Sequence, residues 1–237
     1  MSTSRKSVYL LADSHQLFWP PENNSLISMI REDLDVNSGK AFKAAYLGMS
    51  NGDQTEFYQL FQAAMNNIGA HEARMVKADA ADEDLDFLKE ANLLLLAGGE
   101  VGLGWSVMQK AGYDAIFTER FLAGSVLVGV SAGAVQLGMG FKEEGQSFIS
   151  TTKIVPFYID AHDEQRQWCR LKSLLGGQED FAKGYGIPKG GAMVVHADTI
   201  LEPLQIPVEE FFREPSANAV LRSNILMPRG VRSDDVS

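Results

Sequence analysis

The sequence has little cysteine, no long apolar run and no excess of positive charge, and each absence excludes a class of protein. Cys169 is the single cysteine of the 237 residues, so no disulfide can form within the chain, and a cysteine-based zinc site would need a second subunit. No apolar run approaches the roughly 18 residues that a membrane-spanning helix needs. The apolar run Val8–Ala12, after a polar start, is too short for the core of a signal peptide, so we expect a cytoplasmic protein.

Acidic residues outnumber basic ones. The chain has 31 Asp and Glu against 21 Lys and Arg, a formal net charge of -10 and a pI of about 4.9. Nucleic acids and anionic membranes usually bind a basic face, so we expect neither as a partner. The hydrophobic share of 45% and the charged share of 22% are near the globular average, which argues against disorder.

The chain length favours one α/β domain over residues 1–237, with a frayed tail over 229–237. The acidic residues between Asp79 and Asp86 are expected to cap and solvate a helix rather than to bind a metal ion. We expect no metal and no other cofactor.

Short apolar runs alternate with helical patterns before residue 131. None of these runs alternates apolar with polar residues, which is typical of strands buried on both faces of a parallel sheet. Strands that alternate with helices predict βαβ units with right-handed crossovers. The predicted strands are Val8–Ala12, Ala44–Leu47, Ala73–Val76, Leu93–Ala97 and Val126–Val130, and the predicted helices are Asn24–Leu34, Asp53–Ile68 with Asp53 as N-cap, Asp82–Glu90, and Trp105–Phe121 with a break near Gly112.

The pattern changes to shorter elements beyond residue 137. Gly138–Ser150 is typical of a loop or hairpin, Lys153–Ile159 of a strand, and Asp163–Leu175 of a helix with Trp168 turned inward. From Gly184 onward, short apolar runs alternate with Gly and Pro. This indicates small, partly antiparallel strands that complete the sheet.

The most informative local pattern is LVGVSAGA at residues 127–134, an apolar strand that runs into G-x-S-x-G. A nucleophile on a strand-to-helix elbow has a strained backbone, and Gly129 and Gly133 would relieve the crowding around it. The elbow would present the Ser131 hydroxyl at the carboxyl end of a strand, where open α/β sheets place their sites. The Ala132 N–H would then face a developing oxyanion. The alternative is a simple Gly-Ser turn.

A serine nucleophile needs a base, and the sequence has four histidines. His162 follows a predicted strand and precedes a predicted helix, which places it near the same rim as the serine. His196 would be the base in the usual α/β-hydrolase arrangement, which would correspond to an esterase. His15 could also reach the rim, whereas His71 lies at the opposite edge.

A glycine pair follows the predicted strand Leu93–Ala97. A buried strand that runs into Gly98-Gly99 lets backbone N–H groups approach a ligand closely. Gly99 could donate the second hydrogen bond to an oxyanion. A tight turn between strand and helix is the alternative.

Together these segments resemble the serine peptidase family of dipeptidase E (aspartyl dipeptidase) and cyanophycinase, which has the class I glutamine amidotransferase-like fold. G-x-S-A-G-A is a much more specific match than G-x-S-x-G. The resemblance extends over most of the chain and includes Gly98-Gly99, Gly129-Val130-Ser131-Ala132-Gly133-Ala134, Ile159-Asp160-Ala161-His162 with Gln165-Arg166 and Arg170-Leu171 after it, and Gly186-Ile187-Pro188-Lys189-Gly190.

The resemblance implies an α/β three-layer sandwich with a mainly parallel central sheet, helices on both faces and a nucleophile elbow after a central strand. It implies a serine-type peptidase with Ser131 as nucleophile, His162 as general base, and the Gly99 and Ala132 amides as oxyanion hole. Short peptides with an acidic or β-linked aspartyl residue are the implied substrates. Dimers occur in the family, so a homodimer is compatible with the resemblance.

Arg166 lies four residues past His162, on the same face of the predicted helix. We therefore expect Arg166 to bind a substrate carboxylate. The alternative is a surface ion pair with Glu164 or Asp163.

Some positions depart from the family pattern. Gln146 stands where the family has the carboxylate that orients the histidine, and a short gap would bring Glu144, or Glu143, to that place. Gln146 could accept the histidine N–H more weakly than a charged group would. Glu100, which we expect to contact substrate, replaces the usual Asn or Asp, and Lys189 replaces the usual Glu.

These departures leave two hypotheses. The first is a peptidase that acts through an acyl-enzyme on Ser131. The second is a catalytically degenerate member that binds a peptide or partner in the same cleft.

Overall fold

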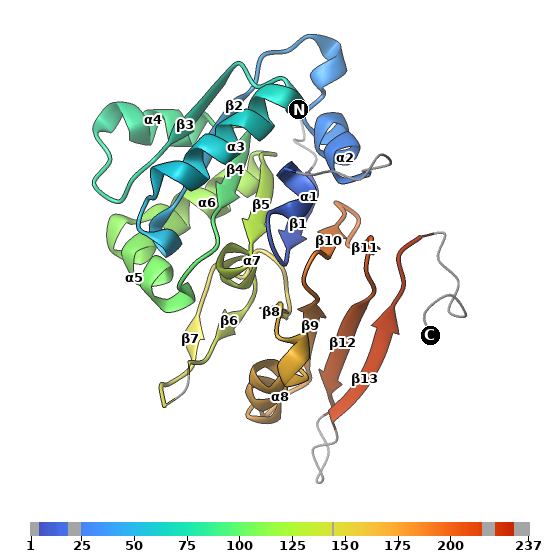
Figure 1. Cartoon of the computed structure of the whole chain (residues 1–237). Coiled ribbons are helices and arrows are strands. Elements are labelled where there is room, and N and C mark those ends of the chain that lie inside the picture. Colours follow the sequence, from blue (N-terminus) through green and yellow to red (C-terminus); the bar gives the residue numbers. More distant parts are fainter. Residues whose placement is uncertain (1–4, 19–24, 144, 215–220, 230–237) are drawn as a thin grey trace.

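A seven-stranded sheet with helices on both faces forms the centre of the molecule (Figure 1), a computed structural model that describes residues 5–18, 25–143, 145–214 and 221–229. The α/β class and the mainly parallel central sheet are therefore as predicted. Most of the predicted tail, and Glu144, lie outside the described residues. Across the sheet the strands are β11 (Leu201–Leu204), β10 (Ala192–Val195), β1 (Val8–Leu11), β5 (Val126–Val130), β4 (Leu93–Leu96), β2 (Lys43–Leu47) and β3 (Glu72–Met75).

The predicted apolar runs form the parallel part of this sheet. β1, β5, β4, β2 and β3 pair in parallel, so their carboxyl ends meet at one edge. Every residue of β1, β4 and β5 is buried, which explains why these runs contain no polar residue. β10 and β11 extend the sheet beyond β1 in antiparallel pairing.

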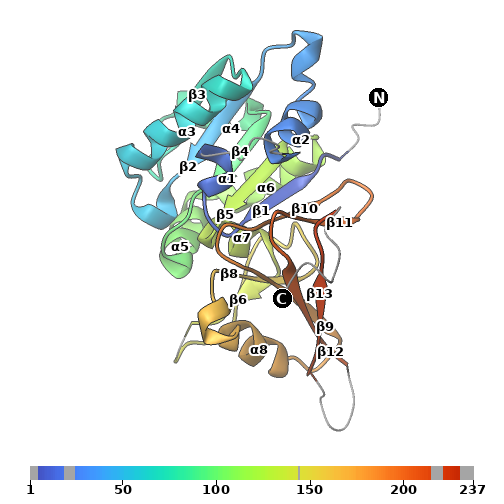
Figure 2. The same cartoon turned by 45° about the vertical axis from the view of Figure 1, so that its right-hand side comes forward.

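Two layers of helices cover the faces of the sheet (Figure 2). Gly112, with φ 74°, separates α5 from α6, which confirms the predicted break. One layer holds α1 (His15–Phe18), α2 (Ser25–Asp33) and α3 (Thr55–Ile68), with the short turn η1 (Val36–Ser38), and the other holds α4 (Asp82–Glu90), α5 (Val101–Ala111), α6 (Tyr113–Leu122) and α7 (Ala132–Leu137).

Asp53 does not cap α3. The helix begins after Gln54, which occupies the N-cap position and makes no side-chain capping hydrogen bond. Asp53 has φ 57° and donates its N–H to the Gly48 carbonyl, so it closes the turn that follows η2 (Met49–Asn51). The predicted N-cap is therefore wrong, because the turn determines the conformation of Asp53.

A second sheet, which the sequence pattern did not predict, lies beside the first (Figure 1). β8 and β9 pair in parallel, and the remaining strands are antiparallel. Of the strands in the last part of the chain, only β10 and β11 therefore belong to the central sheet. The second sheet consists of β13 (Leu221–Leu226), β12 (Val208–Arg213), β9 (Ala182–Ile187) and β8 (Tyr158–Ala161), and the predicted hairpin is formed by β6 (Gly140–Phe141) and β7 (Ile149–Ser150).

The predicted helix over 163–175 forms only in its second half, as α8 (Cys169–Gly176), after the short turn η3 (Glu164–Arg166). Between them, Gln167 and Trp168 have φ values of 53° and 58°. Trp168 is 1% exposed, and its indole Nε1 donates to Glu209 of β12 at 2.7 Å. Burial of this large ring against the second sheet offsets the cost of the left-handed backbone, which local helix propensity does not include.

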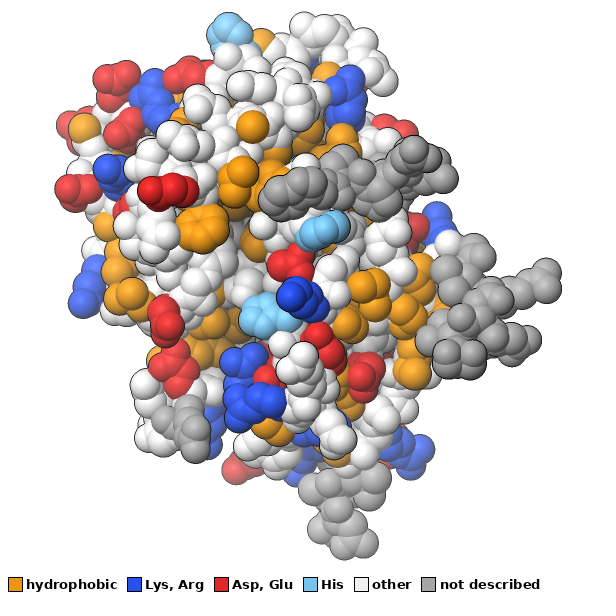
Figure 3. Space-filling model, viewed as in Figure 1, with side chains coloured by type: hydrophobic (Ala, Val, Ile, Leu, Met, Phe, Trp, Pro, Cys, Tyr) orange, Lys and Arg blue, Asp and Glu red, His pale blue; other side chains and the backbone are white. Residues whose placement is uncertain are grey.

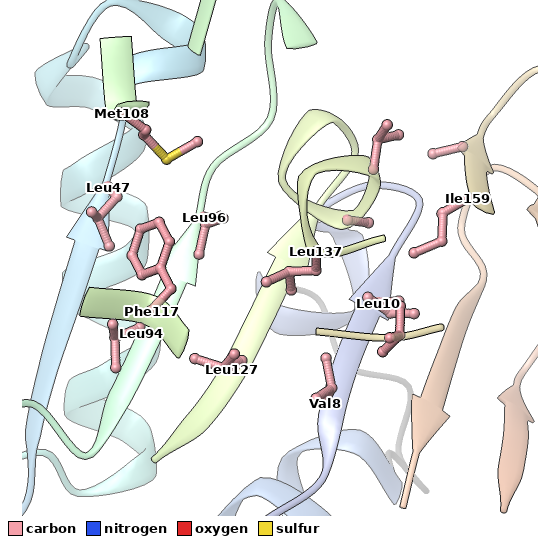
Figure 4. Packing of buried hydrophobic residues seen from close by; sticks show 14 of the residues in the cluster. Val8, Leu10, Leu47, Leu94, Leu96, Met108, Phe117, Leu127, Leu137 and Ile159 are labelled. Atoms are coloured by element: carbon pink, nitrogen blue, oxygen red, sulfur yellow. The ribbon is translucent and has the colours of Figure 1, made fainter. Parts of the chain in front are cut away.

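A continuous apolar cluster joins the two sheets (Figure 4). It extends from Leu47 of β2 and Met108 of α5 to Leu10 of β1 and Ile159 of β8. β8 is therefore fixed against the central sheet by the same core that holds β5. Within the described ranges, no helix combines the length and the apolar character needed to cross a bilayer.

Candidate active site

Ser131 occupies a sharp turn between β5 and α7. Its φ of 50° and ψ of -109° are unfavourable for an L-residue. The turn is held by the core, because the Ser131 N–H donates to the Leu11 carbonyl of β1 at 2.8 Å. The strained turn leaves the side chain half-buried at the carboxyl edge of the parallel strands. This is the geometry of a nucleophile elbow.

The glycines on either side of Ser131 lie where a side chain has no room. A Cβ on Gly129 would be 2.7 Å from the Ala134 Cα, and a Cβ on Gly133 would be 2.1 Å from the Leu96 carbonyl oxygen. The crowding predicted for this motif is therefore real. It allows α7 to pack directly against β4 and β5.

His162 lies beside Ser131 and comes from a segment of the second sheet. It follows β8 directly, and its Nε2 lies 2.8 Å from the Ser131 Oγ. Its φ is 47°, and its N–H donates to the Ile187 carbonyl of β9 at 2.9 Å. The pair therefore has the hydrogen-bond geometry that a nucleophile and a general base require.

The histidine expected for an α/β-hydrolase arrangement lies elsewhere. His196 follows β10, which runs antiparallel to β1, so it lies at the opposite edge of the sheet from Ser131. Its Nε2 is 2.7 Å from the Glu202 carboxylate. The alternative that His196 is the base is therefore wrong, and the direction of β10 is the reason.

The Gly99 backbone lines the cavity that contains the pair. Its φ is 137°, and a Cβ there would be 2.0 Å from the Ser50 carbonyl oxygen, so only glycine fits. That same carbonyl accepts the Glu100 N–H at 2.7 Å, which fixes the loop. Ser50, in the polar turn after β2, is a supporting residue that the sequence pattern did not reveal.

Two backbone amides remain available in this cavity. Ala132 is the first residue of α7, so its N–H has no partner within the helix. Among the described residues, neither the Ala132 N–H nor the Gly99 N–H donates to any acceptor. Both residues line the cavity beside Ser131, which is the arrangement that an oxyanion hole requires.

The cavity has a volume of about 400 Å³ and a strongly charged wall (Figure 3). Arg166 and Glu100 both line it, as expected, although Arg166 comes from η3 rather than from a continuous helix. Arg166 is 62% exposed, and its Nε lies 4.0 Å from Asp163. The charged lining residues are Lys142, Arg166, Arg170, Glu100, Glu143 and Asp160.

Asp160 is a buried carboxylate in this wall. Burial raises its pKa to about 6, although the Arg170 guanidinium, 2.8 Å from Oδ1, acts in the opposite direction. Within the described part of the chain, its Oδ2 has no hydrogen-bond partner. The sequence pattern gave Asp160 no role beyond membership of the histidine segment.

Gln146 and Glu143 are bonded to each other rather than to His162. The Gln146 Nε2 donates to Glu143 Oε2 at 2.9 Å, and Glu143 Oε1 accepts the Gly102 N–H at 3.2 Å. The N-terminal end of α5 therefore holds the Glu143 carboxylate. The prediction that Gln146 or Glu143 orients His162 is wrong. Among the described residues, no carboxylate or amide side chain is hydrogen-bonded to the His162 ring.

The described residues contain no group of three or more His, Cys, Asp or Glu side chains that could hold a metal ion.

Comparison with known proteins identifies the family. A peptidase from an acI-B1 Actinobacterium has the same fold, with a TM-score of 0.68, 16% identity and 97% of each chain covered. A Listeria monocytogenes EGD-e protein assigned as a peptidase E gives a TM-score of 0.59 at 13% identity, over 85% of this chain and 99% of the other. No curated protein matches the chain. The family model of peptidase family S51 matches residues 21–202. The chain therefore belongs to peptidase family S51, a family of serine peptidases.

Proposed function

We propose that this peptidase hydrolyses short peptides that carry an acidic or β-linked aspartyl residue, through an acyl-enzyme on Ser131. The observation that carries the proposal is the 2.8 Å contact between the Ser131 Oγ and the His162 Nε2. A hydroxyl held at a strained turn, beside an imidazole and two free amides, provides the groups that acyl transfer needs.

In the proposed reaction, His162 takes the proton from Ser131 as the Oγ attacks the peptide carbonyl. The Gly99 and Ala132 amides donate hydrogen bonds to the tetrahedral oxyanion, an interaction worth several kcal/mol when both are aligned. His162 then protonates the leaving amine, and the C–N bond breaks to leave an ester on Ser131. Water, deprotonated by His162, attacks this ester and releases the acid.

The charged wall supports an acidic substrate. The protein as a whole carries a net charge of -10, so any attraction for a carboxylate has to be local. Arg170 is already hydrogen-bonded to Asp160 at 2.8 Å, whereas the ion pair of Arg166 with Asp163, at 4.0 Å, is longer and leaves the guanidinium 62% exposed. We therefore assign recognition of the substrate carboxylate to Arg166, whose guanidinium can form two parallel hydrogen bonds.

The experiment combines a fluorophosphonate probe with a panel of Asp-X dipeptides and β-Asp-Arg. The wild-type protein should be labelled and should hydrolyse acidic dipeptides, and Ser131→Ala should do neither. Ser173→Ala, on the exposed face of α8, is the matched control and should behave as wild type. If the wild type is neither labelled nor active on any peptide, the proposal is wrong. The site would then be a degenerate cleft that only binds peptides.

A further inference from the structure

A second cavity opens on the other side of the Ser131–His162 pair. Its volume is about 320 Å³, and Ser131, His162 and Gly99 line both this cavity and the charged one. Its wall comes from α1, β2, α3, β4 and β5. The side chains that shape it are Leu17, Tyr46, Phe57, Phe61, Leu95 and Val130.

This second cavity is apolar where the first is charged. Among the described residues that line it there is no Lys, Arg or Glu, and both oxygens of Asp13 already accept N–H groups, from His15 at 2.9 Å and from Gly190 at 2.7 Å. The Asn51 side chain donates to the Tyr46 hydroxyl at 3.0 Å. The Asp13 carboxylate and the Asn51 side chain are therefore committed within the protein. What remains for a ligand is mainly hydrocarbon and aromatic surface.

Phe57 has an unusual position for its residue type. It lies in the first turn of α3 and lines the cavity, yet it is 46% exposed, whereas Phe61 one turn later is 1% exposed. An aromatic ring at the edge of an open apolar cavity gains by covering a ligand group, since burial of apolar surface is favourable.

We propose that this cavity binds an apolar side chain, aromatic or branched aliphatic, of the residue on the leaving-amine side of the scissile bond. The inference rests on the proposed function. It follows from geometry: if the charged wall holds the acidic acyl residue, the chain passes over Ser131 and the next side chain enters the cavity opposite. A volume of about 320 Å³ lies at the lower end of the ~300–1,000 Å³ of small-molecule sites, which suits one side chain rather than a longer segment.

The first experiment compares kcat/KM for Asp-Phe and Asp-Leu with that for Asp-Lys and Asp-Gly. We expect the apolar substrates to be preferred by about tenfold or more, because burial of a few methylene groups already gives discrimination of this size. Equal values for the four dipeptides, with hydrolysis intact, would overturn this inference and leave the proposed function standing.

The second experiment tests the assigned cavity. Phe57→Ser should lower the ratio of kcat/KM for Asp-Phe to that for Asp-Gly by about tenfold. Phe181→Ser is the matched control, since Phe181 is 57% exposed and does not line the cavity. The control should keep the wild-type ratio. A wild-type ratio in Phe57→Ser would reject the cavity as the apolar subsite.

A binding measurement keeps the inference testable if turnover fails. In Ser131→Ala, calorimetry should show that Asp-Phe binds about tenfold more tightly than Asp-Lys, and that Phe57→Ser, added in the same protein, removes the difference. Equal affinities in Ser131→Ala would overturn the inference, whatever the activity of the wild type. If the wild type does not hydrolyse these dipeptides and the binding difference is retained, the result counts against the acyl-enzyme and not against the apolar subsite.

Discussion

The two walls of the site are built in different ways. The wall that carries Ser131 belongs to the central sheet, and its functional groups are a hydroxyl on a strained turn and the amides of Gly99 and Ala132. The wall that carries His162 and Arg166 follows β8 of the second sheet, and its functional groups are side chains on irregular turns. The first wall depends on close backbone packing, whereas the second depends on exposed side chains. Substitutions should therefore be tolerated very differently on the two sides.

The sharpest test of the comparison is Ser131→Ala. We expect kcat/KM to fall by about 10³-fold or more, because the nucleophile and its base act as one unit. The free energy of unfolding should change little, since the hydroxyl is at the rim and the turn is held by its backbone bond to Leu11. The measurements are single-turnover hydrolysis and urea unfolding. Activity within tenfold of wild type would mean that Ser131 is not the nucleophile.

Gly99→Ala tests how closely the first wall is packed. A Cβ there would be 2.0 Å from the Ser50 carbonyl oxygen at a φ of 137°, so we expect a loss of about 2–4 kcal/mol of stability. Displacement of the amide should also lower kcat by roughly 10²-fold.

Gly176→Ala is the control for this change. No atom lies within 4 Å of a Cβ at Gly176, and it ends α8 without a positive φ. It should be neutral or stabilising by up to about 1 kcal/mol. Similar losses from both substitutions would contradict the packing argument.

Asp160 makes the stability of the second wall depend on pH. Burial raises its pKa from 3.8 to about 6, so the folded state binds this proton more tightly than the unfolded state does. The resulting stabilisation is complete below about pH 4 and is lost as the pH rises through about 6, an effect on the order of 3 kcal/mol.

Asp160→Asn should remove this slope. Urea unfolding at pH 4 to 7 should show the wild type losing stability relative to Asp160→Asn, while exposed Asp180→Asn keeps the wild-type slope. Parallel slopes for wild type and Asp160→Asn would show that Asp160 is not the titrating group.

Arg166→Gln should give the smallest effect. Its guanidinium is 62% exposed, so water and salt screen its interaction with a substrate carboxylate. We expect KM for Asp-X dipeptides to rise about tenfold with kcat nearly unchanged. Arg222→Gln, on β13 and 59% exposed, is the control. A fall in kcat alone would place Arg166 in the reaction rather than in substrate recognition.

The centre of the parallel sheet could be predicted because β1, β4 and β5 are buried along their whole length. Unbroken apolar runs such as Leu93–Ala97 follow directly from that burial. The second sheet could not be predicted in the same way. β12 contains Glu209 and Glu210, and β9 contains Gly184 and Gly186, so neither has a typical strand pattern.

Two predictions near the site were wrong because of contacts between residues far apart in the chain. Trp168 interrupts the predicted helix because its ring packs against Gly186 of β9 and bonds to Glu209 of β12. Glu143 does not reach His162 because the Gly102 amide holds it. Each of these contacts joins residues far apart in the chain, so no local pattern reports it.

The sequence by itself determined the elbow, since the apolar strand, the serine and its flanking glycines are neighbours in the chain and their geometry is local. Only the tertiary structure decided that His162, and not His196, meets that serine. Strand order and direction depend on pairing between distant segments, and β10 runs antiparallel to β1 while β8 packs its end beside the elbow. The same long-range packing placed a charged cavity on one side of the pair and an apolar cavity on the other.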